Sequence, residues 1–378
     1  MAVLTEEQSM LRDAARTWTQ EKSPVTAFRK VRDSGSAIGY DPAAFAEMAE
    51  MGWTGVIIPE AFGGSDFGYL SLGLILEETG RTLTASPLLS SALAAASAII
   101  LGGNDAQKEA WLTKIASGEI VATLAVDEGA HHNPEKTALA ATASGAGYSL
   151  SGKKTFVLEG GAASLFVVAA RTAGKAGDRD GITLFLVPGD ATGLSRQNLK
   201  LADSRGVANL TFDNVQVGAD AVLGEAGKGW DLLDKTLDRA RAGLAAEMLG
   251  AALQAFEVTL DYLKVRVQFG QVIGSFQALQ HRAAKMFTEL ELARSCVEAA
   301  LTAIDENAAD TAELVSLSKA KMGDVLHLVS NEMVQMHGGI GMTDAHDSGL
   351  FMKRARVTEA LFGGASFHRD RYAKLMGF

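Results

Sequence analysis

The run Arg266-Val-Gln-Phe-Gly-Gln-Val-Ile-Gly-Ser-Phe-Gln277 separates two long segments whose apolar residues recur at helical spacing. A second run, Gln335-Met-His-Gly-Gly-Ile-Gly341, ends a further segment of this kind. Both runs are rich in glycine, which marks turns and allows close approach to the backbone. The helical patterns around them predict an antiparallel four-helix bundle. They cover residues 229–266, 275–305, 311–337 and 349–362.

The first part of the chain is also helical. Leu4, Leu11, Ala15 and Trp18 recur at helical spacing, and similar patterns cover residues 71–81 and 105–116. The most apolar stretch, Leu89 to Leu101, is too short and too rich in serine to cross a membrane. We interpret it as a buried helix.

Near residue 120 the pattern changes to short apolar or β-branched runs punctuated by Gly, Asp and Asn. This spacing is typical of a β-sandwich or barrel. The runs are 121–126, 138–142, 148–150, 155–158, 165–169, 182–187 and 208–212. We therefore predict a mostly α protein with a central β domain. Its predicted parts are an N-terminal helical domain (1–118), a β domain (119–225) and a C-terminal helical bundle (226–378).

Composition excludes several classes of function. The chain has 378 residues, 47% of them hydrophobic, and a formal net charge of -10, which argues against a nucleic-acid partner. No secretory signal or membrane-spanning stretch is evident, and the single cysteine, Cys296, cannot form an internal disulfide. This composition fits a reducing cytoplasm. The adjacent His131 and His132 lack a spaced partner, so we expect no metal site.

The three-part order resembles the acyl-CoA dehydrogenase family over nearly the whole chain. Short motifs in every part carry this resemblance, in the same order as in the family. They are Ile58-Pro-Glu-Ala-Phe-Gly-Gly64, Glu77-Glu-Thr-Gly-Arg81, Gly152-Lys-Lys154, Phe212-Asp-Asn-Val-Gln-Val217, Leu223-Gly-Glu-Ala-Gly-Lys-Gly-Trp230 and the two runs quoted first.

The resemblance implies FAD as cofactor and assigns roles to the two glycine-rich runs. Arg266, Gln268 and Phe269, in the signature that continues to Gln277, would hold the pyrophosphate and adenine. The second run would contact the FAD of a neighbouring subunit through Gln335, Gly338 and Gly339. An arginine offers charge and a planar fork of donors, and glycine lets backbone approach phosphate. The resemblance thus implies an oligomer. The alternatives are a solvated helix end and a plain turn.

The segments that would face the flavin ring depart from the family pattern. Where the family has Thr-Glu-Pro this chain has Asp127-Glu-Gly129, and Trp-Ile-Thr-Asn is replaced by Phe156-Val-Leu-Glu159. Phe156 keeps an aromatic face, while the two threonine hydroxyls become Asp127 and Leu158. We expect FAD to bind in an altered ring environment, with the Asp127 carboxylate directed away from the ring.

The catalytic base is missing from both positions where family members carry a glutamate. These positions correspond to Gly363, near the C-terminus, and Ala240 in the first helix of the bundle. Glu247 follows Ala240 by seven residues, so it shares a helix face with it about 10 Å further along the axis. Its apolar neighbours suit a general base. The alternative is that Glu247 pairs with a basic side chain across the bundle and takes no part in the chemistry.

Asp238 and Arg241 lie three residues apart and so share a helix face. By resemblance they are candidate contacts for CoA or substrate, and a local ion pair is the alternative.

The leading hypothesis from the sequence is FAD-dependent dehydrogenation of an acyl-CoA, with electrons passing to an electron-transfer flavoprotein. Phe362-Gly363 and His368-Arg369 resemble bacterial members that act on steroid side chains or other unusual acyl groups. Some of those assemble from two different subunits. The alternatives are therefore a non-catalytic, FAD-completing subunit of a heteromer, or a lyase on a substituted acyl-CoA.

Overall fold

The computed structural model describes residues 4–378. The chain folds into two compact units, each described by itself. Unit 1 contains the chain up to Arg29 together with Gly73–Thr84 and Arg241–Phe378. Unit 2 contains Lys30–Leu72 and Ala85–Ala240. The predicted boundaries near residues 118 and 225 remain predictions.

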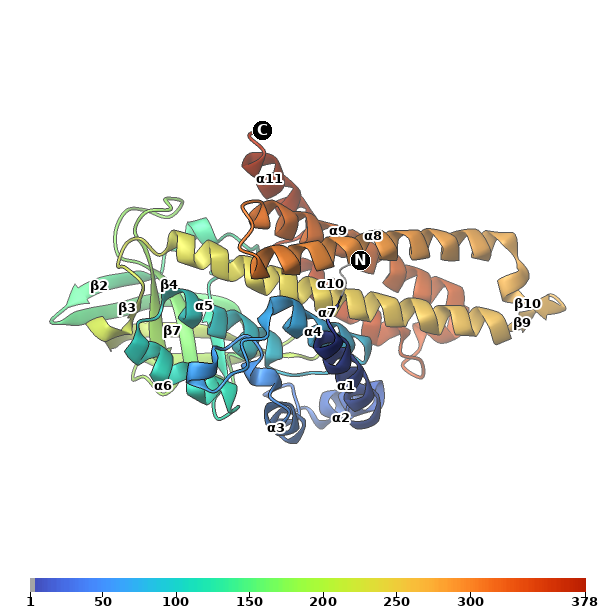
Figure 1. The fold of residues 1–378 in the computed structure, drawn as a ribbon, viewed down its shortest axis with the longest axis horizontal. Helices are drawn as coiled ribbons and strands as arrows, with labels where there is room; N and C mark the ends of the chain where they lie inside the picture. Colours follow the sequence, from blue (N-terminus) through green and yellow to red (C-terminus); the bar gives the residue numbers. More distant parts are fainter. Residues whose placement is uncertain (1–3) are drawn as a thin grey trace. The chain divides into compact units, whose positions relative to one another are not determined.

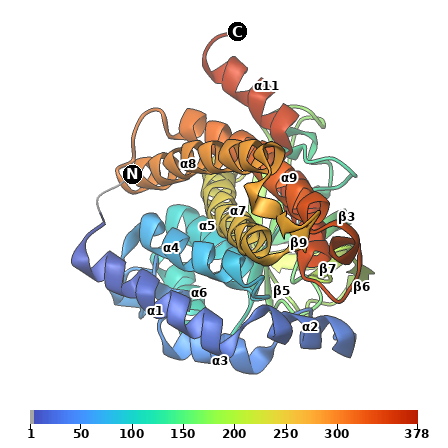
Figure 2. The same cartoon turned by 90° about the vertical axis from the view of Figure 1, so that its right-hand side faces the viewer.

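Unit 1 is helical, as predicted (Figures 1 and 2). Its complete helices are α1 (Glu6–Lys22), α8 (Gln277–Asp305), α9 (Thr311–His337), α10 (Ser348–Ala360) and α11 (Ala365–Leu375). It shares α2 (Val25–Ser34), α4 (Gly68–Arg81) and α7 (Trp230–Val265) with unit 2. Short elements connect the helices: β9 (Val267–Gln268), β10 (Gln271–Val272), η6 (Ile273–Ser275) and η7 (Gly338–Met342). The four predicted bundle helices are confirmed, whereas α11 was not predicted.

Two glycines bring the backbones of α4 and α7 into direct contact within unit 1. A Cβ atom on Gly250 would lie 1.8 Å from the carbonyl oxygen of Glu77. A Cβ atom on Gly80 would lie 2.1 Å from the carbonyl oxygen of Glu247. Neither approach leaves space for a side chain. This close contact fixes the position of Glu247 along the axis of α4.

Unit 2 is built around one hydrogen-bonded sheet, which confirms the predicted central β region. Its strands are β1 (Ala122–Ala125), β2 (Ala140–Ser144), β3 (Gly147–Leu158), β4 (Leu165–Arg171), β5 (Ile182–Pro188), β6 (Leu194–Lys200), β7 (Gly206–Gly218) and β8 (Val222–Leu223). The order is β6-β7-β3-β2-β4-β5-β8, with β1 parallel to β4. Two predicted runs, 148–150 and 155–158, form the single strand β3. The edge strand β6 was not predicted.

The helical elements of unit 2 include the predicted buried helix. They are α3 (Pro42–Glu50), η1 (Trp53–Gly55), η2 (Glu60–Phe62), η3 (Leu88–Ala95), α5 (Ala96–Gly102), α6 (Asp105–Ala116), η4 (Pro134–Lys136) and η5 (Ala219–Ala221). The buried segment η3 is a π-helix rather than an α-helix, and it continues directly into α5. Ser91 Oγ of η3 accepts the N–H of Ala122 at 3.0 Å and so ties the π-helix to β1. π-Helices are rare in proteins overall, and those that occur are often found at functional sites.

No helix within residues 4–378 combines the length and apolarity that crossing a membrane requires.

Candidate active site

Glu247 lies buried in unit 1 and forms an ion pair with Arg354 of α10. Its Oε1 accepts hydrogen bonds from Arg354 Nε at 2.9 Å and Nη2 at 2.7 Å. Both side chains are only 8% exposed. Such a pair stabilises the ionised carboxylate. The structure therefore contains the cross-bundle ion pair that the sequence left open as the alternative to a catalytic Glu247.

Three buried basic side chains converge on the loop that contains Gly363. The carbonyl oxygen of Phe362 accepts from Arg241 Nε at 3.3 Å and from His368 Nε2 at 3.1 Å. Lys319 Nζ donates to the carbonyl oxygens of Thr358 and Gly363, each at 3.0 Å, and to that of Glu359 at 3.2 Å. These contacts pin the end of α10 and the following loop in one position.

Lys319 was not identified from the sequence, although a signal was present. Val315, Met322 and Leu326 lie on one helical face of α9, and Lys319 occupies the same face. It is 1% exposed. A lysine on an apolar face must find acceptors inside the protein, because a buried unpaired ammonium group is costly. Here the acceptors are backbone carbonyls at the C-terminal end of a helix, where cations are favoured.

Gly363, which the sequence comparison above aligns with an expected base position, has no room for a side chain. Its φ angle is +103°, a conformation that favours glycine. A Cβ atom there would lie 2.4 Å from Cδ1 of Phe367 and 3.0 Å from Nε2 of His368. The ring of Phe367 therefore fills the space into which a glutamate would project. The loss of the carboxylate is accompanied by packing that excludes it.

The buried bases of this cluster have altered protonation. Burial and the nearby Arg241 lower the pKa of Lys319 to about 7. Burial, followed by Arg241 and Lys319, lowers the pKa of His368 far below its ordinary value. His368 is therefore neutral, with its proton on Nε2, the atom that donates to Phe362. Its Nδ1 has no hydrogen-bond partner among the described residues.

The neutral His368 predicts a loss of stability in mild acid. Below the ordinary histidine pKa of about 6.5, the unfolded chain binds a proton that the folded chain does not, so unfolding becomes easier as the pH falls. Denaturant unfolding between pH 7.5 and 5.0 should show an extra loss of about 1–2 kcal/mol that is absent in His368→Asn. The exposed His281 provides the control substitution His281→Asn. Equal pH slopes for the native chain and His368→Asn would contradict the assignment.

The candidate substrate contacts Asp238 and Arg241 are both buried, at 5% and 0% exposure. The Arg241 guanidinium lies 5.5 Å from the centre of the Phe367 ring. A buried arginine of this kind suits the reacting end of a substrate better than the hydrated phosphates of CoA. Their role as substrate contacts remains a prediction.

The two glycine-rich runs meet at one end of unit 1. Tyr262, one turn before Arg266, donates through its hydroxyl to the carbonyl oxygen of His337 at 3.4 Å. The centres of the Tyr262 and His337 rings are 4.3 Å apart. The hairpin that follows Arg266 and the turn that begins at Gly338 therefore come from neighbouring helix ends. Arg266, Gln268, Phe269, Gln277, Gln335, Gly338 and Gly339 are all exposed.

The residues expected to face the flavin ring lie in unit 2. Phe156 in β3 has a φ of +53° and is 44% exposed, and its N–H donates to Asn209 Oδ1 at 3.2 Å. Leu158 is 9% exposed and pairs with Val207 of β7. The Asp127 carboxylate accepts from His132 Nδ1 at 2.8 Å and from the N–H of Asn133 at 3.2 Å. The negative charge of Asp127 is thus directed toward the loop that contains His132 and Asn133.

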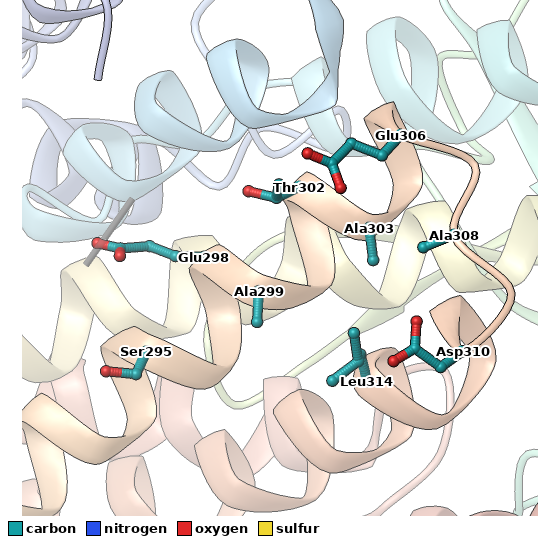
Figure 3. Close-up of a pocket in the computed structure, with 9 residues that line it drawn as sticks. All are labelled: Ser295, Glu298, Ala299, Thr302, Ala303, Glu306, Ala308, Asp310 and Leu314. Carbon is teal, nitrogen blue, oxygen red and sulfur yellow. The ribbon is translucent and has the colours of Figure 1, made fainter. Parts of the chain in front are cut away.

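A separate cavity of about 450 Å³ in unit 1 contains none of the predicted site residues (Figure 3). It lies where α8 ends and α9 begins. Its lining includes the carboxylates of Glu298, Glu306 and Asp310. Residues 4–378 contain no group of three or more His, Cys, Asp or Glu side chains suited to a metal ion.

Comparisons with known proteins decide the family. The chain matches the acyl-CoA dehydrogenase N-terminal domain over residues 5–119, the middle domain over 123–215 and the C-terminal domain over 227–377. It is 32% identical to the acryloyl-CoA reductase (NADH) of Anaerotignum propionicum, across 97% of this chain and 93% of that protein. The chain belongs to the acyl-CoA dehydrogenase family.

Solved structures of other acyl-CoA dehydrogenases share the fold. The butyryl-CoA dehydrogenase of Megasphaera elsdenii is similar over 100% of this chain and 99% of its own, with a TM-score of 0.92 and 28% identity. A steroid acyl-CoA dehydrogenase named for two components, Tcur3481 and Tcur3483, matches over 98% of each chain with a TM-score of 0.89 and 32% identity. This acyl-CoA dehydrogenase is accordingly a flavoprotein oxidoreductase that uses FAD.

The exposed end of unit 1 fits part of an FAD molecule. Gly338 has a φ of +62°, which accounts for its being glycine. The backbone conformation of Gly339 does not require a glycine, and a Cβ atom there would meet nothing within 4 Å. Phe269 leaves 93% of its surface exposed on the neighbouring hairpin. An open glycine backbone, an exposed arginine and an exposed aromatic ring are the groups that a pyrophosphate and an adenine require.

Proposed function

We propose that this acyl-CoA dehydrogenase oxidises the α,β-bond of an acyl-CoA thioester in the cytoplasm, with Glu247 as the base. The observation that carries the proposal is that Glu247 is a buried carboxylate of α7, whereas neither family base position bears a carboxylate. Glu247 lies on the same helix as the empty position at Ala240. A buried and rigidly held carboxylate is suited to receive a proton from carbon.

In this reaction a proton leaves the α-carbon, a hydride leaves the β-carbon, and a double bond forms between them. FAD, when bound, accepts the hydride. Glu247 receives the proton on its carboxylate. Arg354 holds Oε1 through two hydrogen bonds, so it orients the carboxylate before transfer. Reoxidation by an electron-transfer flavoprotein completes the proposed cycle.

Lys319 and Arg241 hold the loop between α10 and α11 in position through hydrogen bonds to its backbone. Their donors occupy the carbonyl oxygens of Phe362 and Gly363. A loop held in this way keeps one conformation, so the surface that it offers to a bound ligand does not change. We propose that it shapes the space for an acyl group, which in other family members is shared with a glutamate.

We further propose that both glycine-rich runs contact the same FAD. The contact between Tyr262 and His337 places the two runs side by side, so they need not serve two cofactors. Phe156 and Asp127, which belong to the segments expected near the flavin ring, lie in unit 2. A second subunit that presents this end of unit 1 to the FAD of its neighbour would account for an oligomer.

Anaerobic mixing of the purified flavoprotein with a panel of acyl-CoA thioesters tests the proposal. We expect at least one thioester to bleach the flavin absorbance, because two electrons leave the substrate for the cofactor. The pantetheine form of the same acyl group should bleach more slowly, since it lacks the nucleotide. If the protein holds FAD and no thioester bleaches it, the proposed dehydrogenase activity is refuted.

A non-catalytic role in a heteromer is the second candidate, and one observation favours it. Gly363 lacks a base and Glu247 is engaged by Arg354, so a base on a partner chain would remove the need for one here. The steroid relative is named for two components. In this case the protein purified alone would be colourless, and it would gain FAD only when co-expressed with a related subunit. A yellow homo-oligomer that is bleached by substrate would exclude this candidate.

A further inference from the structure

Arg239 of α7 is a buried cation whose hydrogen bonding within the chain is incomplete. It is 8% exposed, and its Nη1 donates to the carbonyl oxygen of Lys235 at 3.0 Å. Its Nε has no hydrogen-bond partner among residues 4–378, and no carboxylate in that range pairs with it. A buried guanidinium without a counter-ion is costly, so such a group needs an anion from outside the chain.

The aromatic surroundings of Arg239 hold the guanidinium in place without using its Nε–H. Its Cζ lies 5.2 Å from the centre of the Tyr69 ring, a cation–π contact. The Tyr69 hydroxyl lies 3.1 Å from Ser97 Oγ. An arginine held on an aromatic face keeps its N–H groups in the guanidinium plane, where they can receive a planar oxyanion. Tyr69 therefore fixes the position of the Arg239 guanidinium and leaves its Nε–H available for a ligand.

A second observation marks the same region of unit 2 as functional. Ser97 lies in the first turn of α5, directly after the buried π-helix Leu88–Ala95. Helices with π geometry are rare and are frequently found at functional sites. Arg239 also directly precedes Ala240, one of the two positions that carry the base in other members of the family.

We infer that Arg239 binds an oxyanion of the substrate, and that the substrate class is an acyl-CoA whose acyl group carries a carboxylate. This inference rests on the proposed function. A carboxylate matches a single arginine in charge and in its planar, two-point geometry. The phosphates of CoA carry more charge and are strongly hydrated, which suits exposed cations better than a side chain that is 8% exposed.

The test compares two thioesters of equal chain length, adipoyl-CoA and hexanoyl-CoA, by the second-order rate constant of anaerobic flavin bleaching. We expect the native protein to prefer the thioester that carries a carboxylate. Arg239→Met should lower the adipoyl-to-hexanoyl ratio by about 10- to 100-fold, the effect of losing a charge-assisted hydrogen-bonded pair. Arg239→Lys should keep part of the preference, because the charge remains while the fork is lost.

Arg179 provides the matched control. Its Cζ lies 5.0 Å from the centre of the Trp230 ring, so it makes the same kind of cation–π contact, but its side chain is 63% exposed. Arg179→Met should leave the adipoyl-to-hexanoyl ratio at the native value. An equal change in both variants would overturn the inference, since it would report a general effect of losing an arginine.

A second arm separates the two sources of an oxyanion by comparing hexanoyl-CoA with hexanoyl-pantetheine. If Arg239→Met lowers the CoA-to-pantetheine ratio and leaves the adipoyl preference intact, the anion is a CoA phosphate and the carboxylate class is overturned. If neither ratio changes, Arg239 binds no oxyanion. Calorimetric binding of adipoyl-CoA and hexanoyl-CoA to the folded variants answers the same question without turnover, so failure of the proposed oxidation is distinguishable from failure of this inference.

Discussion

Glu247→Gln is expected to slow anaerobic flavin bleaching by about 10²- to 10⁴-fold, the usual contribution of a positioned general base. Glutamine keeps the shape of the side chain and an oxygen acceptor for Arg354, so the fold and the FAD content should be retained. It cannot accept the α-proton as a carboxylate does. Rapid-mixing absorbance measurements with the best thioester of the panel give the rate directly.

Glu77→Gln is the control for the loss of a buried carboxylate. Glu77 belongs to the same unit and lies 3.7 Å from Arg294, and burial raises its pKa to about 7. Its replacement removes a carboxylate from a comparable setting but not from the proposed site. Bleaching of Glu247→Gln at the native rate would exclude Glu247 as the base and direct attention to a partner subunit.

Gly363→Ala is expected to lower the free energy of unfolding by about 1–3 kcal/mol. The added Cβ atom would lie 2.4 Å from the Phe367 ring, and the φ of +103° is strained for any other residue. Gly349→Ala is the control, because a Cβ atom there meets nothing within 4 Å and the residue lies in α10. Alanine should stabilise that helix slightly. Denaturant titration measures both changes, and equal effects at the two glycines would contradict the packing argument.

The same geometry predicts that a glutamate cannot be restored at this position. Adding Gly363→Glu to the Glu247→Gln variant should not recover bleaching, because Phe367 and His368 occupy the space of the new side chain. A recovery to more than a tenth of the native rate would show that the loop can reopen. Positions 247 and 363 would then be interchangeable as sites of the base in this chain.

Local patterns predicted most of the helices because their signals are contained in a few turns. The predicted segment 311–337 coincides with α9, and 105–116 coincides with α6. Strand β6 escaped prediction because it lies at the edge of the sheet and most of its side chains face solvent, so it has no apolar alternation. Strand β3 was divided into two runs because Lys154 looked polar, although it is fully buried against Glu128.

The candidate site was less accessible to sequence reasoning because its contacts join distant residues. Glu247 and Arg354 are 107 residues apart, and many arginines would have been equally plausible partners. The contact of Lys319 with Gly363 joins α9 to the loop after α10 in the same way. The glycine-rich runs were recognisable because a phosphate-binding backbone is encoded by neighbouring residues. The position of a base depends on how helices pack.

The glycine contact between α4 and α7 determines which parts of the chain can be separated. Residues 73–84 belong structurally with residues 241–378, although the sequence between them folds elsewhere. A fragment limited to the C-terminal helices would lack the surface that receives Gly250 and the backbone of Glu247. In such a fragment Glu247, the proposed base, would lose the α4 backbone that packs against it, although the sequence of the fragment is unchanged. Transplanting this site into another protein therefore requires a short helix from the first hundred residues as well as the bundle.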